Sequence, residues 1–258
     1  MTKRLSILLT NDDGYDSAGL KQMYSALNAE HDVVVAAPET EQSGIGHAFT
    51  LDRPLHYRDL PAELGMKGYI INGTPSDCVK FALSVLLKHK PDFVVSGMNI
   101  GENSGICAFY SGTVAAAREG AFWRVPSAAF SLCANAGNFV EPYCQRALAI
   151  FRGIAEIGPA ENGRCVFYNV NFPGCAPGKC RGVKVTRQST AFFDDRYRRV
   201  ETAVQQPGYV VYGDKKDVEE LDTYDSRALM NNYITVSPLG FDATAEWALP
   251  LLGGLEDL

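Results

Sequence analysis

The chain has 258 residues, of which 46% are hydrophobic and 21% are charged, and its formal net charge is −6. This length suits one large α/β domain, or one domain with an extension, and the composition excludes a disordered chain. The negative charge, without a long basic stripe, argues against polymeric nucleic acid as a partner, because many phosphates would need many Lys and Arg side chains. No apolar run approaches the roughly 20 residues that span a bilayer, so we expect no membrane partner.

The N-terminal segment and the cysteines indicate the cell compartment. The start, MTKRLSILLTNDDG, has two basic residues before a short apolar stretch, but acidic residues follow without a small-residue cleavage site. The seven cysteines are odd in number and scattered, which is typical of reduced cytosolic thiols. Cys175 and Cys180 lack a second Cys/His pair, so a structural loop is favoured over a zinc site. We therefore expect a cytoplasmic protein.

Apolar strands alternate with amphipathic helices along the first two thirds of the chain. Strands are predicted at residues 5–9, 33–38, 68–72, 92–97, 126–132 and 165–173. Helices are predicted where Leu20, Met23, Tyr24 and Leu27 recur at helical spacing, from Thr74 to Leu87, over 111–122 and over 141–158. Thr74 suits an N-cap, with Pro75 at the first helical position and Asp77 in the first turn. This alternation predicts a parallel sheet covered on both faces.

After about residue 183 the pattern changes. Four strand-like segments follow, separated by Pro/Gly turns and acidic stretches: VKVTRQ, FFDDRYRRVETA, GYVVYGD and YITVSPL. They predict an appended β-hairpin region and a return to the core, rather than an independently folding domain. We accordingly divide the chain into a core over residues 1–183, a β-rich extension over 184–235 and a C-terminal segment over 236–258.

Polar clusters follow the predicted strands or open a helix at four points of the chain. They are Asn11–Gly14 after the first strand, Glu41–Gly44 after the second, Ser96–Gly101 at the end of the strand at 92–97, and Tyr110–Thr113 at the start of a helix. In open parallel sheets, ligands bind outside the carboxyl ends of the strands, where helix N-termini also point. We therefore expect the four loops to meet at one crevice.

Asp12 and Asp13 are the candidate ligands of a metal ion. Two adjacent carboxylates on a tight loop repel each other when both are ionised, and a divalent cation with a preference for oxygen, such as Mg²⁺, Mn²⁺ or Ca²⁺, relieves the repulsion. The alternative is a solvated acidic turn with a helix N-cap, although Asp16 or Ser17 is better placed to cap the next helix. Asn99 could offer an amide oxygen to a metal or a donor to phosphate, or could simply be a turn residue.

Two further motifs are candidates for substrate contacts. Ser111, Gly112 and Thr113 open a helix whose first amides have no internal partner, so a phosphate could bind there, or Ser111 could be an ordinary cap. His47 could donate a proton to a leaving oxygen, although a lone histidine is more often structural. No GxSxG, GxxxxGK[ST] or GxGxxG motif follows a strand, which argues against an α/β-hydrolase, an NTPase and a dinucleotide enzyme.

At these residues the sequence resembles the SurE survival-protein family. The matching runs are TNDDGYDSAGL, APETEQSGIGHAFTL, NGTPSDCV, VSGMNIGENSG and YSGTVAAAREG, and weaker agreement continues through NVNFP, VKVTRQ and YITVSPL. The resemblance implies a Rossmann-like, three-layer α/β fold with a C-terminal β-hairpin extension used in homodimer or homotetramer contacts. It also implies a 5′/3′-nucleotidase that depends on a divalent metal and releases phosphate from nucleoside monophosphates, in some members acting on short polyphosphate.

The resemblance also assigns roles to residues. It implies one divalent ion per subunit, Mg²⁺, Mn²⁺ or similar, at the positions of Asp12, Asp13, Ser43 and Asn99. The surrounding phosphate-binding loops match Asn11, Gly44, Ser111, Gly112 and Thr113. Two departures from the family pattern affect the rim of the pocket: Cys107 stands where many relatives have aspartate, and Glu39-Thr40 where they often have Asp-Arg.

The predicted reaction is the in-line attack of a water molecule on phosphorus, with Asp13 as a candidate base and His47 as a candidate acid. Two other interpretations stay open. A non-catalytic nucleotide- or metal-binding module would bind nucleotides without releasing phosphate. A metal-dependent hydrolase or deacetylase with a non-phosphate substrate would leave the Ser-Gly-Thr start of the helix unexplained.

Overall fold

A computed structural model describes residues 3–158, 166–201 and 208–255 of the chain. Within these residues the main sheet has nine strands in the order β3-β4-β2-β1-β5-β6-β7-β13-β8. Their bounds are β1 Ser6–Thr10, β2 Asp32–Pro38, β3 Tyr57–Asp59, β4 Gly68–Ile71, β5 Phe93–Ile100, β6 Ser127–Leu132, β7 Phe167–Phe172, β8 Val183–Val185 and β13 Ile234–Leu239. The predicted strands therefore all form, except that residue 165, the first of the segment 165–173, lies outside the described residues.

The parallel strands β4-β2-β1-β5-β6-β7 make up the body of the sheet. The chain starts at β1, moves outward through β2 to β4, and then returns to β5 on the other side of β1 before moving outward again. This is the Rossmann-like order, and its direction reverses between β1 and β5, where ligands bind at the carboxyl ends of the strands. β3 pairs antiparallel with β4, and β13 pairs antiparallel with β7. The prediction of a parallel sheet is therefore correct for the body of the sheet, whereas the sheet is mixed toward its edges.

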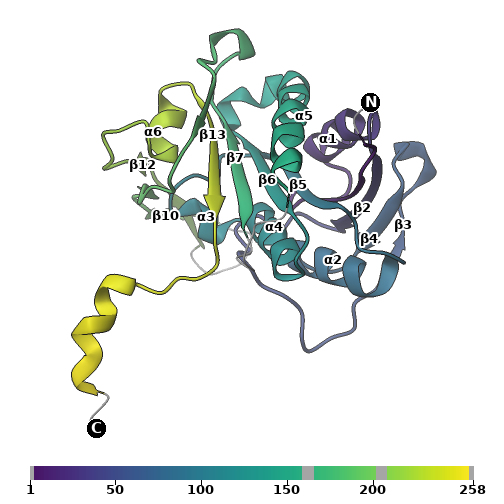
Figure 1. Ribbon diagram of the computed structural model, residues 1–258, viewed down its shortest axis with the longest axis horizontal. Helices are drawn as coiled ribbons and strands as arrows, with labels where there is room; N and C mark the ends of the chain where they lie inside the picture. Colours follow the sequence, from purple (N-terminus) through teal and green to yellow (C-terminus); the bar gives the residue numbers. More distant parts are fainter. Residues whose placement is uncertain (1–2, 159–165, 202–207, 256–258) are drawn as a thin grey trace.

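Helices cover both faces of this sheet and complete the three predicted layers (Figure 1). Their bounds are α1 Ala18–Asn28 and α5 Val140–Ile157 on one face, and α2 Pro75–Phe81 and α4 Gly112–Phe122 on the other. Because side chains alternate along a strand, Ile7 and Leu9 pack in the same cluster as Leu20 and Phe151, whereas Leu8 packs in the cluster of α2 and α4. The continuous apolar run of the first strand is thus buried on both faces.

The helix starts follow the predicted capping chemistry. The Thr74 hydroxyl accepts a hydrogen bond from the Asp77 amide at 3.1 Å, and the Asp77 carboxylate accepts one from the Thr74 amide at 3.0 Å. This reciprocal pair is a capping box, and the helix continues beyond α2 as a π-helical turn over Ala82–Leu86. Ser17 caps α1 through a bond from the Leu20 amide, which leaves Asp12 and Asp13 out of that role.

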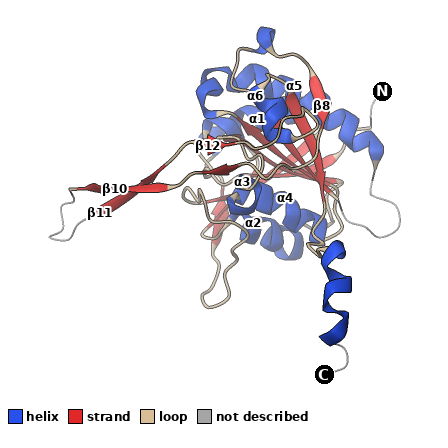
Figure 2. Cartoon of the chain, turned by 90° about the vertical axis from the view of Figure 1, so that its left-hand side faces the viewer, coloured by secondary structure: helices blue, strands red, loops and turns tan. Residues whose placement is uncertain are grey.

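The C-terminal third forms two small β-sheets that are separate from the main sheet. β10 (Arg196–Val200) and β11 (Gly208–Tyr212) form an antiparallel hairpin that extends away from the body in Figure 2, and β9 (Phe192–Phe193) pairs with β12 (Lys215–Lys216). Residues 202 and 203 of the predicted strand FFDDRYRRVETA lie outside the described residues. The last described element, a 3-10 helix at Glu246–Leu255, also projects from the body (Figures 1 and 2).

Several short elements were not predicted from the sequence. They are α3 (Cys107–Tyr110), α6 (Asp225–Met230), the 3-10 helix at Glu246–Leu255 and three shorter 3-10 turns at Ala62–Leu64, Ala134–Phe139 and Pro177–Lys179. Cys175 and Cys180 are free thiols, as are the other cysteines in the described part, and Cys165 lies outside it. Across the described ranges, no helix is both long enough and apolar enough to cross a membrane.

Candidate functional site

The predicted metal ligands lie where the strand order reverses. Asp12 and Asp13 follow β1 closely, and Asn99 lies near the end of the neighbouring β5. The pairing of β5 with β6 shifts between Ser96 and Asn99. Gly97 makes this possible, since its φ is +129° and a Cβ there would lie 2.3 Å from the Phe130 carbonyl oxygen. The irregular end of β5 therefore turns Asn99 to the edge that carries the two aspartates.

Asp12 is buried against the first turn of α4. Its carboxylate accepts hydrogen bonds from the Thr113 amide at 3.0 Å and from the Thr113 hydroxyl at 2.5 Å. Burial raises the pKa of Asp12, and the bonds from Thr113 offset this only in part. Gly112 lets the two segments approach, because a Cβ at that position would lie 2.9 Å from the Asp12 Cβ. Residues 101 positions apart in the sequence thus form one tightly packed unit.

Asp13 has an environment that disfavours its negative charge. Burial, followed by the charges of Asp12 and Glu41, raises its pKa to about 7. Its Oδ2 atom is buried and has no hydrogen-bond partner in the described part of the chain. An unpaired carboxylate oxygen beside a second carboxylate is unfavourable unless a cation neutralises the pair.

Ser43 and Asn99 lie on the two segments that adjoin this pair along the sheet, the loop after β2 and the end of β5. The Asn99 side-chain amide donates to the Gly101 carbonyl at 2.6 Å, so the nitrogen is occupied and the oxygen Oδ1 is the atom that a cation could use. The Ser43 hydroxyl donates to Glu41 at 2.8 Å, and its loop is tied to the site because the Gln42 amide donates to the Asp12 carbonyl at 2.7 Å. Two carboxylates, an amide oxygen and a hydroxyl oxygen fit a hard divalent cation. Within the described ranges, no group of three or more His, Cys, Asp and Glu side chains could hold a metal ion.

The predicted phosphate-binding residues have local structural partners. The Asn11 side chain donates to the Gly14 carbonyl and to the Ser17 hydroxyl, and its own Oδ1 is buried with no partner in the part of the chain that the structure describes. Ser111 accepts a bond from the Val114 amide at 3.1 Å, so it is the N-cap of α4. The donors of Thr113 already serve Asp12. Gly44 lies on the exposed loop with φ +74°.

His47 is bound to a residue that the sequence did not single out. Its Nε2 atom lies 2.9 Å from the Glu119 carboxylate, and its ring stacks on Phe122 with 5.3 Å between the centroids. Glu119 also accepts bonds from Lys80 and Trp123, each at 2.9 Å. The one signal for Glu119 was an acidic residue within the small-residue helix AAAREG, which is too weak to identify its partners.

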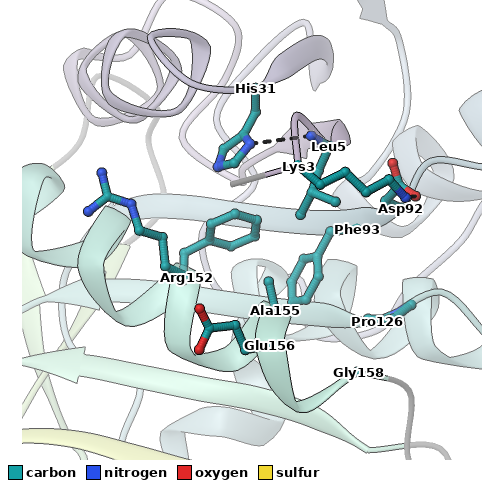
Figure 3. A pocket seen from close by; sticks show the side chains of 11 residues that line it. Lys3, Leu5, His31, Asp92, Phe93, Pro126, Arg152, Ala155, Glu156 and Gly158 are labelled. Carbon is teal, nitrogen blue, oxygen red and sulfur yellow. Dashed lines mark hydrogen bonds and ion pairs between the residues drawn. The ribbon is translucent and has the colours of Figure 1, made fainter. Parts of the chain in front are cut away.

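Several hollows lie around the described part of the protein, and two of them lie at opposite ends of the parallel strands. One, of about 740 Å³, borders the carboxyl ends of β5, β6 and β7 and includes Glu102, Cys133 and Lys215 in its walls. The other, of about 420 Å³, includes Leu5, His31 and Phe93 and lies where β1 and β5 begin (Figure 3). The dashed line in that view is the 3.4 Å bond from the Leu5 amide to the His31 ring. Of these two, the first lies at the carboxyl ends of the strands, the same end of the sheet as Asp12, Asp13 and Asn99.

Comparisons with known proteins agree on one family. The family described as Survival protein SurE matches residues 7–195. The 5′-nucleotidase SurE of Syntrophobacter fumaroxidans is 39% identical, over 96% of this chain and 98% of its own length. The 5′-nucleotidase SurE 1 of Thermus thermophilus is 41% identical, over 97% and 98%. The crystal structure of the SurE protein from Aquifex aeolicus superposes with a TM-score of 0.82 at 33% identity, over 97% of this chain and 99% of that one.

Proposed function

The chain belongs to the SurE survival-protein family, and from that membership we propose that it is a phosphomonoesterase that releases phosphate from nucleoside 5′- or 3′-monophosphates with a divalent metal ion. Short polyphosphate is a further candidate substrate. The observation that carries this proposal is the pair of the buried Asp12 and the partly buried Asp13, which lies at the switch point of the sheet and beside the start of α4. One carboxylate oxygen of Asp13 has no hydrogen-bond partner among the described residues. The relatives that are 5′-nucleotidases support the substrate class.

We infer that Asp12, Asp13, Ser43 and Asn99 hold one divalent ion per subunit, such as Mg²⁺ or Mn²⁺. Such an ion supplies positive charge that polarises phosphoryl oxygens and acidifies water. It also relieves the repulsion that raises the pKa of Asp13. The oxygen-only donor set favours these ions over Zn²⁺, which is usually bound through nitrogen and sulfur ligands.

The start of α4 is the proposed place for the phosphoryl group. Ser111, Gly112 and Thr113 open an 11-residue helix, and the positive end of its dipole favours an anion. Because Thr113 donates to Asp12, an incoming phosphoryl oxygen would compete with Asp12 for these donors. Asn11 and Gly44 shape the neighbouring loops. Asp13 is also the proposed base that takes the proton of the attacking water, because its Oδ2 has no hydrogen-bond partner among the described residues.

The exposed surface of the C-terminal third supports a homodimer or homotetramer. Tyr197 and Tyr209 on the projecting hairpin are 69% and 62% exposed, and Trp247 on the projecting 3-10 helix is 77% exposed. Large apolar groups on projecting segments are typical of association surfaces. We retain the division into a core (1–183), an oligomerisation extension (184–235) and a C-terminal segment (236–258), and propose a cytoplasmic protein whose ligand is a small nucleotide rather than nucleic acid.

The test is release of inorganic phosphate from 5′-AMP, 5′-GMP, 3′-AMP and short polyphosphate, with Mg²⁺ or Mn²⁺ and with a chelator. We expect turnover that stops in the chelator and returns with metal. Asp12→Asn should abolish it. Asp16→Asn is the matched control, because Asp16 lies in the same loop but is exposed and paired with Lys21. Chelator-resistant turnover, or an Asp12→Asn variant with nearly full rate, would refute the assignment. Nucleotide binding without phosphate release would favour the non-catalytic binding module.

A further inference from the structure

The loop that carries Ser43 has little core of its own. It runs from the end of β2 at Pro38 to the start of β3 at Tyr57, and its apolar side chains stay partly in solvent. Ile45 is 37% exposed, Phe49 49% and Leu51 82%. A segment with so few buried apolar groups is held mainly by polar contacts with the rest of the protein. The position of Ser43 therefore depends on where those contacts lie.

Ser43 lies between two sets of polar anchors. On one side, the Gln42 amide donates to the Asp12 carbonyl at 2.7 Å. On the other side, the Gly46 amide donates to the Tyr110 carbonyl at 2.9 Å, and His47 is bound to Glu119 at 2.9 Å. His47 provides the first side-chain anchor that follows Ser43, and only three residues separate the two.

The Glu119 carboxylate, which accepts the hydrogen bond from His47, is itself held in place by several contacts. Its side chain is 4% exposed and is bound by His47, by Lys80 from α2 and by Trp123 from the end of α4. Burial alone would raise the pKa of Glu119, but the bonds from His47, Lys80 and Trp123 outweigh it and the pKa is lowered. The carboxylate is thus ionised and fixed in place, which makes its bond to His47 charge-assisted and directional.

The same helix positions both parts of the metal site. Thr113 in the first turn of α4 binds Asp12, and Glu119 lies six residues later, which is about 9 Å along a helix at 1.5 Å per residue. Asp12 is therefore fixed to one end of α4, and the Ser43 loop is fixed near the other end through His47. The contact of His47 with α4 thus adds a second fixed point to the one beside Ser43, where the Gln42 amide donates to the Asp12 carbonyl.

We propose that Glu119, through its bond to His47, is a positioning residue that holds Ser43 at the metal site. The inference rests on the proposed function for the role of Ser43. It differs from the prediction that His47 donates a proton to the leaving oxygen, because positioning needs only a hydrogen-bond donor at residue 47. A glutamine at this position can donate through its amide nitrogen but cannot release a proton at neutral pH.

The experiment measures the dissociation constant of Mn²⁺ by electron paramagnetic resonance, without substrate, for His47→Ala and His47→Gln. We expect His47→Ala to weaken Mn²⁺ binding about tenfold, which corresponds to about 1.4 kcal/mol, and His47→Gln to restore most of it. His89→Ala is the matched control, because that imidazole is exposed and lies outside the site. Thermal unfolding of each variant in a chelator measures any loss of stability separately.

A double-mutant cycle with Ser43→Ala identifies the route of the effect. If His47 acts through Ser43, then His47→Ala changes the Mn²⁺ dissociation constant far less in the Ser43→Ala background than in the wild type. The inference is overturned if His47→Ala lowers turnover while Mn²⁺ affinity stays unchanged, if His47→Gln is as impaired as His47→Ala, or if the two effects simply add. If the wild type binds Mn²⁺ but releases no phosphate, the proposed enzymatic function is refuted. The double-mutant cycle then still tests whether His47 positions Ser43, because it measures only Mn²⁺ binding. A wild type that binds no Mn²⁺ would overturn both proposals.

Discussion

Replacing Asp13 by asparagine should stabilise the metal-free protein above neutral pH. Burial and the charges of Asp12 and Glu41 raise the pKa of Asp13 from 3.8 to about 7. Between these values the folded protein holds a proton that the unfolded chain has released, so stability falls as pH rises through this window and levels off above about 7. The substituted asparagine carries no charge at any pH, so the variant should escape this loss.

The size of the effect follows from the same shift. One pKa unit corresponds to about 1.36 kcal/mol, so a pKa raised from 3.8 to about 7 lowers the free energy of unfolding by at most about 4 kcal/mol. Because Asp13 is only partly buried, solvent screens its charge, and we expect about half of that, about 2 kcal/mol. Asparagine has nearly the same shape as aspartate, so packing should change little.

Urea unfolding in a chelator, at a series of pH values from about 4.5 to 8.5, measures this difference between Asp13→Asn and the wild type. The advantage of the variant should be smallest at the acidic end and should reach its plateau above neutral pH. Asp16→Asn is again the control, and its difference from the wild type should not follow this pH course. An Asp13→Asn variant that is less stable than the wild type at pH 8, or a difference independent of pH, would refute the reasoning.

Three further predictions concern the same edge of the sheet. Adding Mn²⁺ at about one hundred times its dissociation constant should stabilise the wild type by about 2.7 kcal/mol in urea unfolding, and Asp13→Asn should lose most of this gain. Gly112→Ala should lower kcat at least about tenfold and also lower Tm, because the new Cβ meets the Asp12 Cβ at 2.9 Å and the crowded core must shift; unchanged kcat would contradict the close packing. Thr113→Val should cost about 1–3 kcal/mol of stability, measured by urea unfolding, because the buried Asp12 carboxylate loses a donor. Thr113→Ser, which keeps the hydroxyl, is the control for this loss.

Local patterns predicted the regular elements well. The helical spacing of Leu20, Met23 and Leu27 located α1, and Thr74 with Asp77 predicted a cap that the structure contains as a reciprocal pair. α6 and the 3-10 helix at Glu246–Leu255 were not predicted, because the first is only six residues long and the second contains Pro250 and lies apart from the core. Short or proline-containing segments carry little periodic signal.

The sequence predicted where the site lies, but not the hydrogen bonds between its residues. The rule for carboxyl ends of parallel strands correctly led us to expect Asp12 and Thr113 at one edge, but not that Thr113 donates to Asp12. The partner of His47 lies 72 residues away on the far half of α4, and no local pattern in the sequence connects the two. Such contacts depend on how two elements pack against each other, and the spacing of residues along the sequence does not reveal that packing.

The burial of β1 on both faces has a consequence for the evolution of the site. Ile7 and Leu9 enter one core cluster and Leu8 the other, and β2 and β5 bond to both edges of the strand. A shift of one residue would send every one of these side chains to the wrong face, so an insertion or deletion within β1 is selected against for stability alone. Asp12 and Asp13 directly follow this strand, so the register that the core requires also fixes the position of the two carboxylates relative to β2 and β5. Changes that would move them are therefore unfavourable for folding, independently of any catalytic role.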